Sequence, residues 1–240
     1  YIYSNINNNI ILHYYQLDRL IIKITLMLNK FFTEFFHEIN KKEFDQYIIN
    51  IANNCINYIK NSNITRLENK NDGTALSSAD LKIDNIIRKS LNLFNSKINV
   101  LSEEYNFSLN NYLEEFYWIV DPIDGTRSYI SGGDEYTVNI ALIYKGEPYL
   151  GLIAHPPSKK IWYAKNKKLI IIDNGIQQFY KSSKKNLHDY PTIITSKESN
   201  LELESFLKKF KKIKRIKVSS SLKFCKLAEG QADIYPRFVS

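Results

Sequence analysis

Two aspartates flank a proline in the segment IVDPIDGTRSYISGG, residues 119–133. The apolar run FYWIV at 116–120 precedes them and is typical of a buried strand. Pro122 has no backbone N–H to donate, so we expect the strand to stop pairing at this residue. Asp121 and Asp124 would then lie where a strand ends and a turn begins, which is a usual place for a functional site on a rigid scaffold.

Other acids also stand at expected element boundaries, namely Asp72, Asp80 and the Glu103-Glu104 pair, with no histidine or cysteine beside them. Ligand sets made of oxygen alone suit Mg²⁺ rather than zinc. Carboxylates that converge on one point repel each other unless cations lie between them. Two bridged metal ions can polarise a phosphate ester and ionise the water that attacks it. By composition alone, turn-forming aspartates and surface glutamates explain these acids equally well.

The residues after the second aspartate suit a phosphate ligand. Gly125 allows a close approach of the backbone to a ligand, because it has no Cβ. Thr126, Arg127 and Ser128 are able to begin a helix, whose free N–H groups favour a phosphate. This stretch therefore combines acids for a metal with a backbone for a phosphate.

The chain has 240 residues, of which 44% are hydrophobic and 24% charged, as expected for one large or two small globular domains. Cys55 and Cys225 form neither a disulfide framework nor a metal cluster, so we expect a reducing, cytoplasmic setting, with organellar targeting left open. The apolar piece 20–28 is too short to span a bilayer and contains Lys23. We expect native translation to begin at Met27.

The net charge of +8 is concentrated in residues 159–217, which hold 16 Lys and Arg against 5 Asp and Glu. A basic surface favours anionic partners such as nucleotides, nucleic acid or phosphorylated small molecules. A solvated lysine-rich face is the simpler interpretation of most of these side chains.

Apolar periodicity and turn signals indicate alternating helices and strands. We expect a layered α+β sandwich with a mixed sheet, divided into an N-terminal extension (1–42), a metal-binding subdomain (43–186) and an incomplete C-terminal substrate subdomain (187–240). The expected helices are 43–61, 77–94, 200–213 and 219–232; the expected strands are 97–106, 116–120, 137–144, 149–156, 160–165, 168–173, 191–196, 215–219 and 233–238, and residues 61–80 are expected to form a loop before the second helix.

Four segments, NDGTALSSAD, VLSEE, VDPIDGT and SSSLKFCKLAEGQADIYPRF, together resemble the Mg²⁺-dependent, lithium-sensitive phosphatase superfamily that includes inositol monophosphatase. Within it they are most similar to the 3'(2'),5'-bisphosphate nucleotidases, over residues from about 43 to 238. The resemblance implies a phosphomonoesterase of sulfate assimilation that removes the 3'-phosphate of adenosine 3',5'-bisphosphate. It also implies two or more Mg²⁺ ions, and a small nucleotide rather than nucleic acid as the partner.

The resemblance also implies a role for each matching residue. Metal ions would bind Glu103, Asp121, the carbonyl of Ile123 and Asp124, with Glu103 also counted as catalytic. Asp80 and Thr126 would take a proton from the attacking water, because a hydroxyl held by a carboxylate can relay a proton. The reacting phosphate would bind Gly125 and Thr126. A second phosphate would bind Ser220, Ser221, Lys223 and Arg237. Asp72 would have a supporting position.

The sequence departs from the family pattern in two places. The loop after 192–196 reads SKESN and lacks the histidine that the family often has there. The family continues past YPRF with a Trp-Asp pair whose Asp binds the second metal, whereas this sequence ends at Ser240. We therefore expect impaired activity from this chain. An inositol monophosphatase, and an inactive nucleotide- or polyanion-binding relative, remain alternatives.

Overall fold

The computed structural model describes residues 30–62, 66–69, 75–105, 115–180 and 190–238, together with residues 23 and 27. For residues 66–69 and 75–76 it describes the backbone alone. Contacts divide the chain into two units, residues 1–48 and 49–240. The described part of the first unit is helical from residue 30 to 39 and again from Lys42, where α2 (Lys42–Asn61) begins. No helix among the described residues is long and apolar enough to cross a membrane.

Two of the predicted helices are confirmed with nearly the predicted limits, α2 and α3 (Ser78–Phe94). Acidic residues in the first turn of α2 and a lysine in its last turn complement the helix dipole. The start of α3 is fixed by a capping box, in which the Ser77 hydroxyl accepts from Asp80 N and the Asp80 carboxylate accepts from Ser77 N. The capping box places the Asp80 carboxyl group at the very start of the helix.

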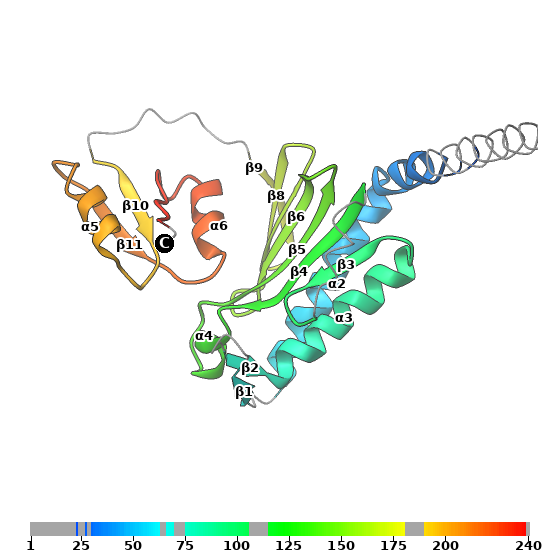
Figure 1. The fold of residues 1–240 in the computed structure, drawn as a ribbon, viewed down its shortest axis with the longest axis horizontal. Helices are drawn as coiled ribbons and strands as arrows, with labels where there is room; N and C mark the ends of the chain where they lie inside the picture. The colour runs from blue at the N-terminus through cyan, green and yellow to red at the C-terminus, as the bar shows by residue number, and fades with distance from the viewer. Residues whose placement is uncertain are drawn as a thin grey trace, which may run out of the picture. The chain divides into compact units, whose positions relative to one another are not determined.

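A seven-stranded sheet in the order β3-β4-β5-β6-β7-β8-β9 forms the centre of the second unit (Figure 1). Only the β3–β4 pair is parallel, and the other pairs are antiparallel neighbours in sequence, so the predicted mixed sheet with helices is confirmed. The strands are β3 (Asn99–Ser102), β4 (Phe116–Asp124), β5 (Thr137–Tyr144), β6 (Glu147–His155), β7 (Lys160–Lys165), β8 (Lys168–Asp173) and β9 (Ile176–Tyr180).

The two faces of this sheet carry different residues. Large apolar side chains such as Trp118, Ile140 and Tyr163 are fully buried, and α3 packs against β4. Residues that pair directly across strands share a face. On the opposite face one such row runs across five strands: Asp121, Asn139, Ile153, Trp162 and Ile171.

Strand β4 corrects one prediction, because it continues through Pro122 to Asp124. Asp121 pairs with Asn139 and Asp124 with Thr137, with an irregular register between the two pairs. A bulge leaves residues out of the ladder, so the missing N–H of Pro122 is tolerated. Both aspartates therefore belong to the sheet rather than to a turn that follows it.

The C-terminal part of the second unit contains the parallel pair β10 (Thr192–Thr195) and β11 (Lys214–Lys217), with the helices α5 (Leu201–Leu207) and α6 (Leu222–Ala228) (Figure 1). One buried cluster joins this part to the sheet: Trp162, Ile171, Ile194, Val218, Leu222, Cys225 and Ala232. Helix α6 therefore packs on the face of the sheet that carries the row from Asp121 to Ile171.

Three further element predictions were wrong. Residues 61–80 contain a short antiparallel pair, β1 (Arg66–Asn69) and β2 (Ala75–Ser77). The helix expected at 200–213 ends at Leu207, and tighter i→i+3 bonds follow. Those turns bring Phe210 against the small core around Ile193. The strand expected at 233–238 is reduced to one bridge between Ile193 and Ile234.

Candidate active site

Asp80 and Thr126 meet although 46 positions separate them in sequence. The Thr126 hydroxyl lies 3.1 Å from Asp80 Oδ1 and 2.9 Å from the carbonyl oxygen of Ile123. Asp80 Oδ2 is held by the capping box, 2.6 Å from Ser77 Oγ, and the whole Asp80 side chain is buried. One oxygen of the carboxylate is therefore fixed by its own helix, and the other faces Thr126.

The short helix α4 (Thr126–Ile130) begins at Thr126, as predicted, after Gly125 at a φ of 96°. A Cβ on Gly125 would lie 2.7 Å from the carbonyl oxygen of Glu135 and 3.4 Å from Ser220 Cβ. The glycine is required by this close packing of the protein on itself, and by the left-handed backbone.

Glu103 and Asp124 are both close enough to Asp121 to act on its titration. Burial, and then the neighbouring charges of Glu103 and Asp124, raise the pKa of Asp121 to about 8. Asp121 Oδ1 is buried without a hydrogen-bond partner. The three acids share one neighbourhood, yet within the described ranges no three Asp, Glu, His or Cys side chains form a ready-made metal cluster.

A hard cation fits this neighbourhood by its chemistry. The donors are all oxygens, namely three carboxylates and the carbonyl of Ile123. A divalent ion would remove the repulsion between the acids, and it would give the unpartnered oxygen of Asp121 a ligand.

Two cavities adjoin this neighbourhood and share Asp124 as a lining residue. The first has a volume of about 330 Å³ and is lined by Glu103, Ile123, Asp124, Gly125, Thr126, Arg127, Ser128 and Ser219. The second has a volume of about 420 Å³, and its polar and charged lining residues are Asp124, Ser196, Glu198, Ser199, Asn200, Ser220, Lys223 and Arg237. The first cavity thus contains two acids and one arginine, and the second contains two acids and two basic side chains.

The family model described as "Inositol monophosphatase family" matches residues 40–239. The chain belongs to the inositol monophosphatase family. The predicted family resemblance and its layered fold are confirmed.

Relatives within the family share much of this chain. The 3'(2'),5'-bisphosphate nucleotidase CysQ of Buchnera aphidicola is 37% identical over 195 residues, which are 78% of this chain and 71% of that protein. The protein of the same name from Escherichia coli (strain K12) is 32% identical over 171 residues, which are 70% of this chain and 68% of that protein.

Solved structures of the family show the same fold. The crystal structure of CysQ from Bacteroides thetaiotaomicron has a TM-score of 0.67 and 26% identity, covering 84% of this chain and 82% of that one. An IMPase/NADP phosphatase complexed with Mg²⁺ and phosphate has a TM-score of 0.62 at 19% identity, covering 88% of this chain and 74% of that one.

The structure brings most of the candidate family residues into the two cavities. Ser220, Lys223 and Arg237 line the second cavity together, and Lys223 Nζ lies 5.7 Å from the ring centroid of Tyr235. Ser221 is not among the lining residues, because its hydroxyl donates to Asp124 Oδ2 at 2.7 Å. Asp72 lies outside the described residues.

The sequence analysis missed several residues of the site. The loop from Ser196 to Asn200 lines the second cavity, although it lacks the histidine, and so do the aromatic rings of Phe224 and Tyr235. Asn139 was also missed. Its signal was a single amide within the apolar run 137–144, opposite Asp121 once β4 and β5 are paired.

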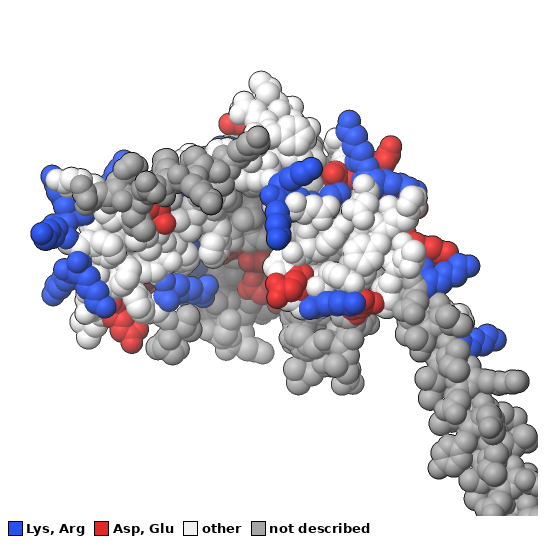
Figure 2. Space-filling view, turned by 90° about the horizontal axis from the view of Figure 1, so that it is seen from above, with Lys and Arg blue, Asp and Glu red and all other residues white. Residues whose placement is uncertain are grey.

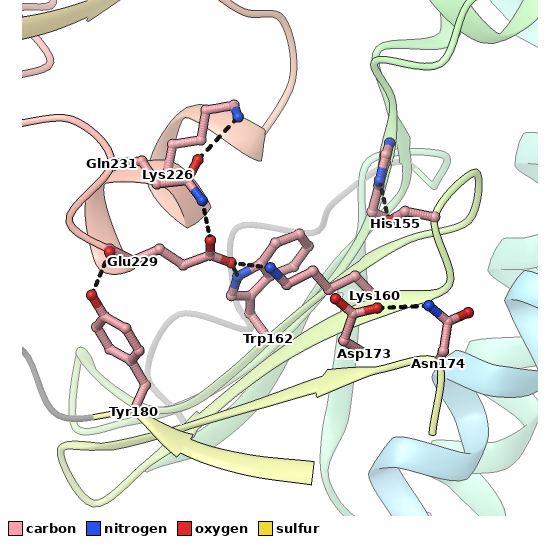
Figure 3. Close-up of polar contacts among 10 residues, drawn as sticks. His155, Lys160, Trp162, Asp173, Asn174, Tyr180, Lys226, Glu229 and Gln231 are labelled. Carbon is pink, nitrogen blue, oxygen red and sulfur yellow. Dashed lines mark hydrogen bonds and ion pairs between the residues drawn. The ribbon is translucent and has the colours of Figure 1, made fainter. Parts of the chain in front are cut away.

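At its C-terminal end, α6 is anchored through Glu229, as Figure 3 shows. One oxygen of its carboxylate accepts from Trp162 Nε1 at 2.6 Å and forms an ion pair with Lys160 at 2.5 Å, and the other accepts from Gln231. The carbonyl oxygen of Glu229 accepts from Tyr180.

His155 has a structural role in the same region. Its ring nitrogens bond to Ser158 Oγ at 2.7 Å and to the carbonyl of Asp134 at 2.6 Å, which ties β6 to the loop before β5. His188 lies outside the described residues. On the face drawn in Figure 2, lysine and arginine side chains are spread among acidic and uncharged ones.

Proposed function

We propose that the protein is a Mg²⁺-dependent phosphomonoesterase that converts adenosine 3',5'-bisphosphate to AMP and phosphate. Its family membership and the named activity of its CysQ relatives support this proposal. The single structural observation that carries it is the Asp80–Thr126 contact at the edge of a cavity that contains Glu103 and Asp124 and adjoins a cavity with two basic side chains.

In this proposal, Thr126 and Asp80 move the proton of the attacking water. The hydroxyl has one hydrogen and two possible acceptors, Asp80 Oδ1 and the carbonyl of Ile123. If the carbonyl is taken by another ligand, Asp80 becomes the remaining acceptor. Thr126 then donates to Asp80, and its lone pairs are free to accept from the water. Asp80 is buried and directs Oδ1 to the Thr126 hydroxyl, so the carboxylate is in position to accept this proton.

Glu103, Asp121, the Ile123 carbonyl and Asp124 would hold Mg²⁺, two ions or more by the family resemblance. When bound, these ions polarise the phosphate and lower the pKa of the water. The chain itself contributes negative charge in a largely buried position, where it interacts more strongly with a cation than it would in solution.

A substrate with two phosphates fits the paired cavities. The reacting phosphate would lie beside Gly125 and Thr126 in the first cavity. The other phosphate would lie in the second cavity, with Lys223 as a point charge, Arg237 as a two-pronged donor and Ser220 as a hydroxyl. Since Asp124 borders both cavities, the two phosphates would lie on either side of it.

Phosphate release from adenosine 3',5'-bisphosphate, with and without Mg²⁺, tests this function. We expect release only with Mg²⁺, little activity on AMP or inositol 1-phosphate, and retention of activity in Thr126→Ser. Thr126→Val keeps the shape and removes the hydroxyl, so we expect it to lose on the order of a hundredfold or more in kcat. Equal turnover of inositol 1-phosphate would favour the monophosphatase alternative, and Mg²⁺-independent turnover would contradict the proposal.

A further inference from the structure

A continuous chain of polar contacts links the two aspartates of β4 through residues of two other segments. Asn139 Nδ2 lies 3.5 Å from Asp121 Oδ2 and donates to Ser221 Oγ at 3.1 Å. Ser221 Oγ in turn donates to Asp124 Oδ2 at 2.7 Å. The sheet register places Asn139 directly opposite Asp121, and Ser221 is the residue before α6.

The hydrogen bonds in this chain of contacts can be donated in only one direction. An ionised Asp124 accepts and cannot donate, so the single hydrogen of Ser221 points to it. The Ser221 oxygen must then accept from the amide NH₂ of Asn139, which fixes the orientation of that amide. The contacts from Asn139 and Ser221 both end on Oδ2 atoms, that of Asp121 and that of Asp124. Asp121 Oδ1 remains buried and has no hydrogen-bond partner.

We propose that Asn139 and Ser221 are positioning residues for the metal-binding carboxylates, and that Ser221 is not a substrate contact. Their bonds hold one oxygen of each aspartate, so that the other oxygen is presented to a cation. This inference rests on the proposed function, since it concerns the same site. Partners that orient metal ligands commonly change metal affinity 10- to 100-fold when they are removed.

The same contacts join the metal acids to the substrate cavity. Ser221 and Lys223 are two positions apart at the start of α6, one on Asp124 and the other in the cavity that Asp124 borders. The far end of α6 is held independently by Glu229, and its first residue Leu222 and its middle residue Cys225 lie in the buried cluster. Removal of the Ser221 hydroxyl should therefore leave the helix in place.

The test is a titration with Mg²⁺ alone of the wild-type protein and of Ser221→Ala, Asn139→Ala and Ser221→Thr. The rise in unfolding temperature reports the binding of Mg²⁺. We expect the Mg²⁺ concentration for the half-maximal rise to increase about tenfold or more in the two alanine variants. Ser221→Thr keeps the hydroxyl and should restore the wild-type value. Ser131→Ala is the matched control, since that hydroxyl donates to a backbone carbonyl in the nearby helix α4.

The substrate KM at saturating Mg²⁺ completes the test, and it should stay within about twofold of wild type in every variant. An unchanged Mg²⁺ midpoint with a raised KM would overturn the proposal and make Ser221 a substrate contact. An unchanged midpoint and KM with a lower unfolding temperature would also overturn it, and make the contacts purely structural. Wild-type protein that binds Mg²⁺ without releasing phosphate would count against the proposed function, while the titration would still decide this inference.

Discussion

At its C-terminal end, α6 presents a carboxylate with several partners, whereas at its N-terminal end it meets carboxylates that have too few. Glu229 is bonded by Trp162 and Gln231 and paired with Lys160, and only 9% of its side chain is exposed. Asp121 is surrounded by other acids and keeps one oxygen without a partner. Both carboxylates contact residues of the same row on the same sheet face.

This difference distinguishes a compensated carboxylate from an uncompensated one. A buried charge is tolerated when an opposite charge and hydrogen bonds compensate its lost hydration, as for Glu229. A cluster of acids without such compensation is unfavourable for the protein alone, and it becomes favourable when a cation binds. The end of α6 that lacks compensation is therefore the end at which a ligand is expected.

The largest expected effect comes from Asp121→Asn, which removes a proposed metal ligand at almost constant shape. Loss of about 4 kcal/mol of transition-state stabilisation corresponds to about a thousandfold loss of Mg²⁺-dependent phosphate release. Asp173→Asn, at the exposed end of β8, is the matched control and should keep full activity. Activity retained in Asp121→Asn would show that the metal site has been misassigned.

The pH dependence of stability provides a second test of the uncompensated end. In the Mg²⁺-free folded protein the pKa of Asp121 is raised from 3.8 to about 8, so the folded state holds a proton that the unfolded state releases. The free energy of unfolding should therefore fall as pH rises from about 4 to about 8. Urea unfolding in a chelator at several pH values measures this slope. Asp121→Asn should make the free energy of unfolding nearly independent of pH in this range. If the variant had the same slope as wild type, the proton would belong to another group.

The next effect concerns the compensated end. Glu229→Ala leaves Lys160, whose side chain is 22% exposed, without its partner, and it leaves Trp162 Nε1 without its acceptor. We expect a loss of about 3 kcal/mol in the free energy of unfolding, since one partner of a buried pair is removed. Glu204→Ala breaks a more exposed pair with Arg215 and should cost clearly less stability than Glu229→Ala. Similar losses of stability in Glu229→Ala and Glu204→Ala would show that burial does not distinguish these two ion pairs.

The smallest effect is expected from the substrate cavity. Lys223→Ala should raise the KM for adenosine 3',5'-bisphosphate about 10- to 100-fold, because a charge-assisted bond to phosphate is worth about 1.5–3 kcal/mol. Mg²⁺ binding should not change. Lys226→Ala is the control from the same helix, since this lysine bonds to Gln231 instead. An unchanged KM in Lys223→Ala would mean that the second phosphate lies elsewhere.

Local signals predicted the elements well where pattern and packing agree. The alternating runs of β5 and β6 and the capping residues of α3 are examples. The helix after Asn200 was overextended because Phe210 and Ile213 keep helical spacing, while tertiary contacts with Ile193 favour a tighter turn. Pro122 was taken as the end of β4 because a bulge cannot be read from one strand alone.

The site was predictable mainly through the family resemblance. Spacing alone does not bring Asp80 to Thr126, because their contact depends on the capping box and on the start of α4. The sequence does not show which acceptor the Ser221 hydroxyl reaches, and the structure places it on Asp124. Asn139 required the register of β4 with β5, which neither strand shows by itself.

The most direct test of the account is the thermal unfolding of wild type and Asp121→Asn, each with a chelator and with saturating Mg²⁺, at neutral pH. If Asp121 belongs to an uncompensated acidic site that Mg²⁺ completes, the order of stability must reverse. The variant should unfold at the higher temperature in chelator, and wild type at the higher temperature in Mg²⁺. The same order under both conditions would contradict the claim that these acids exist to hold the metal.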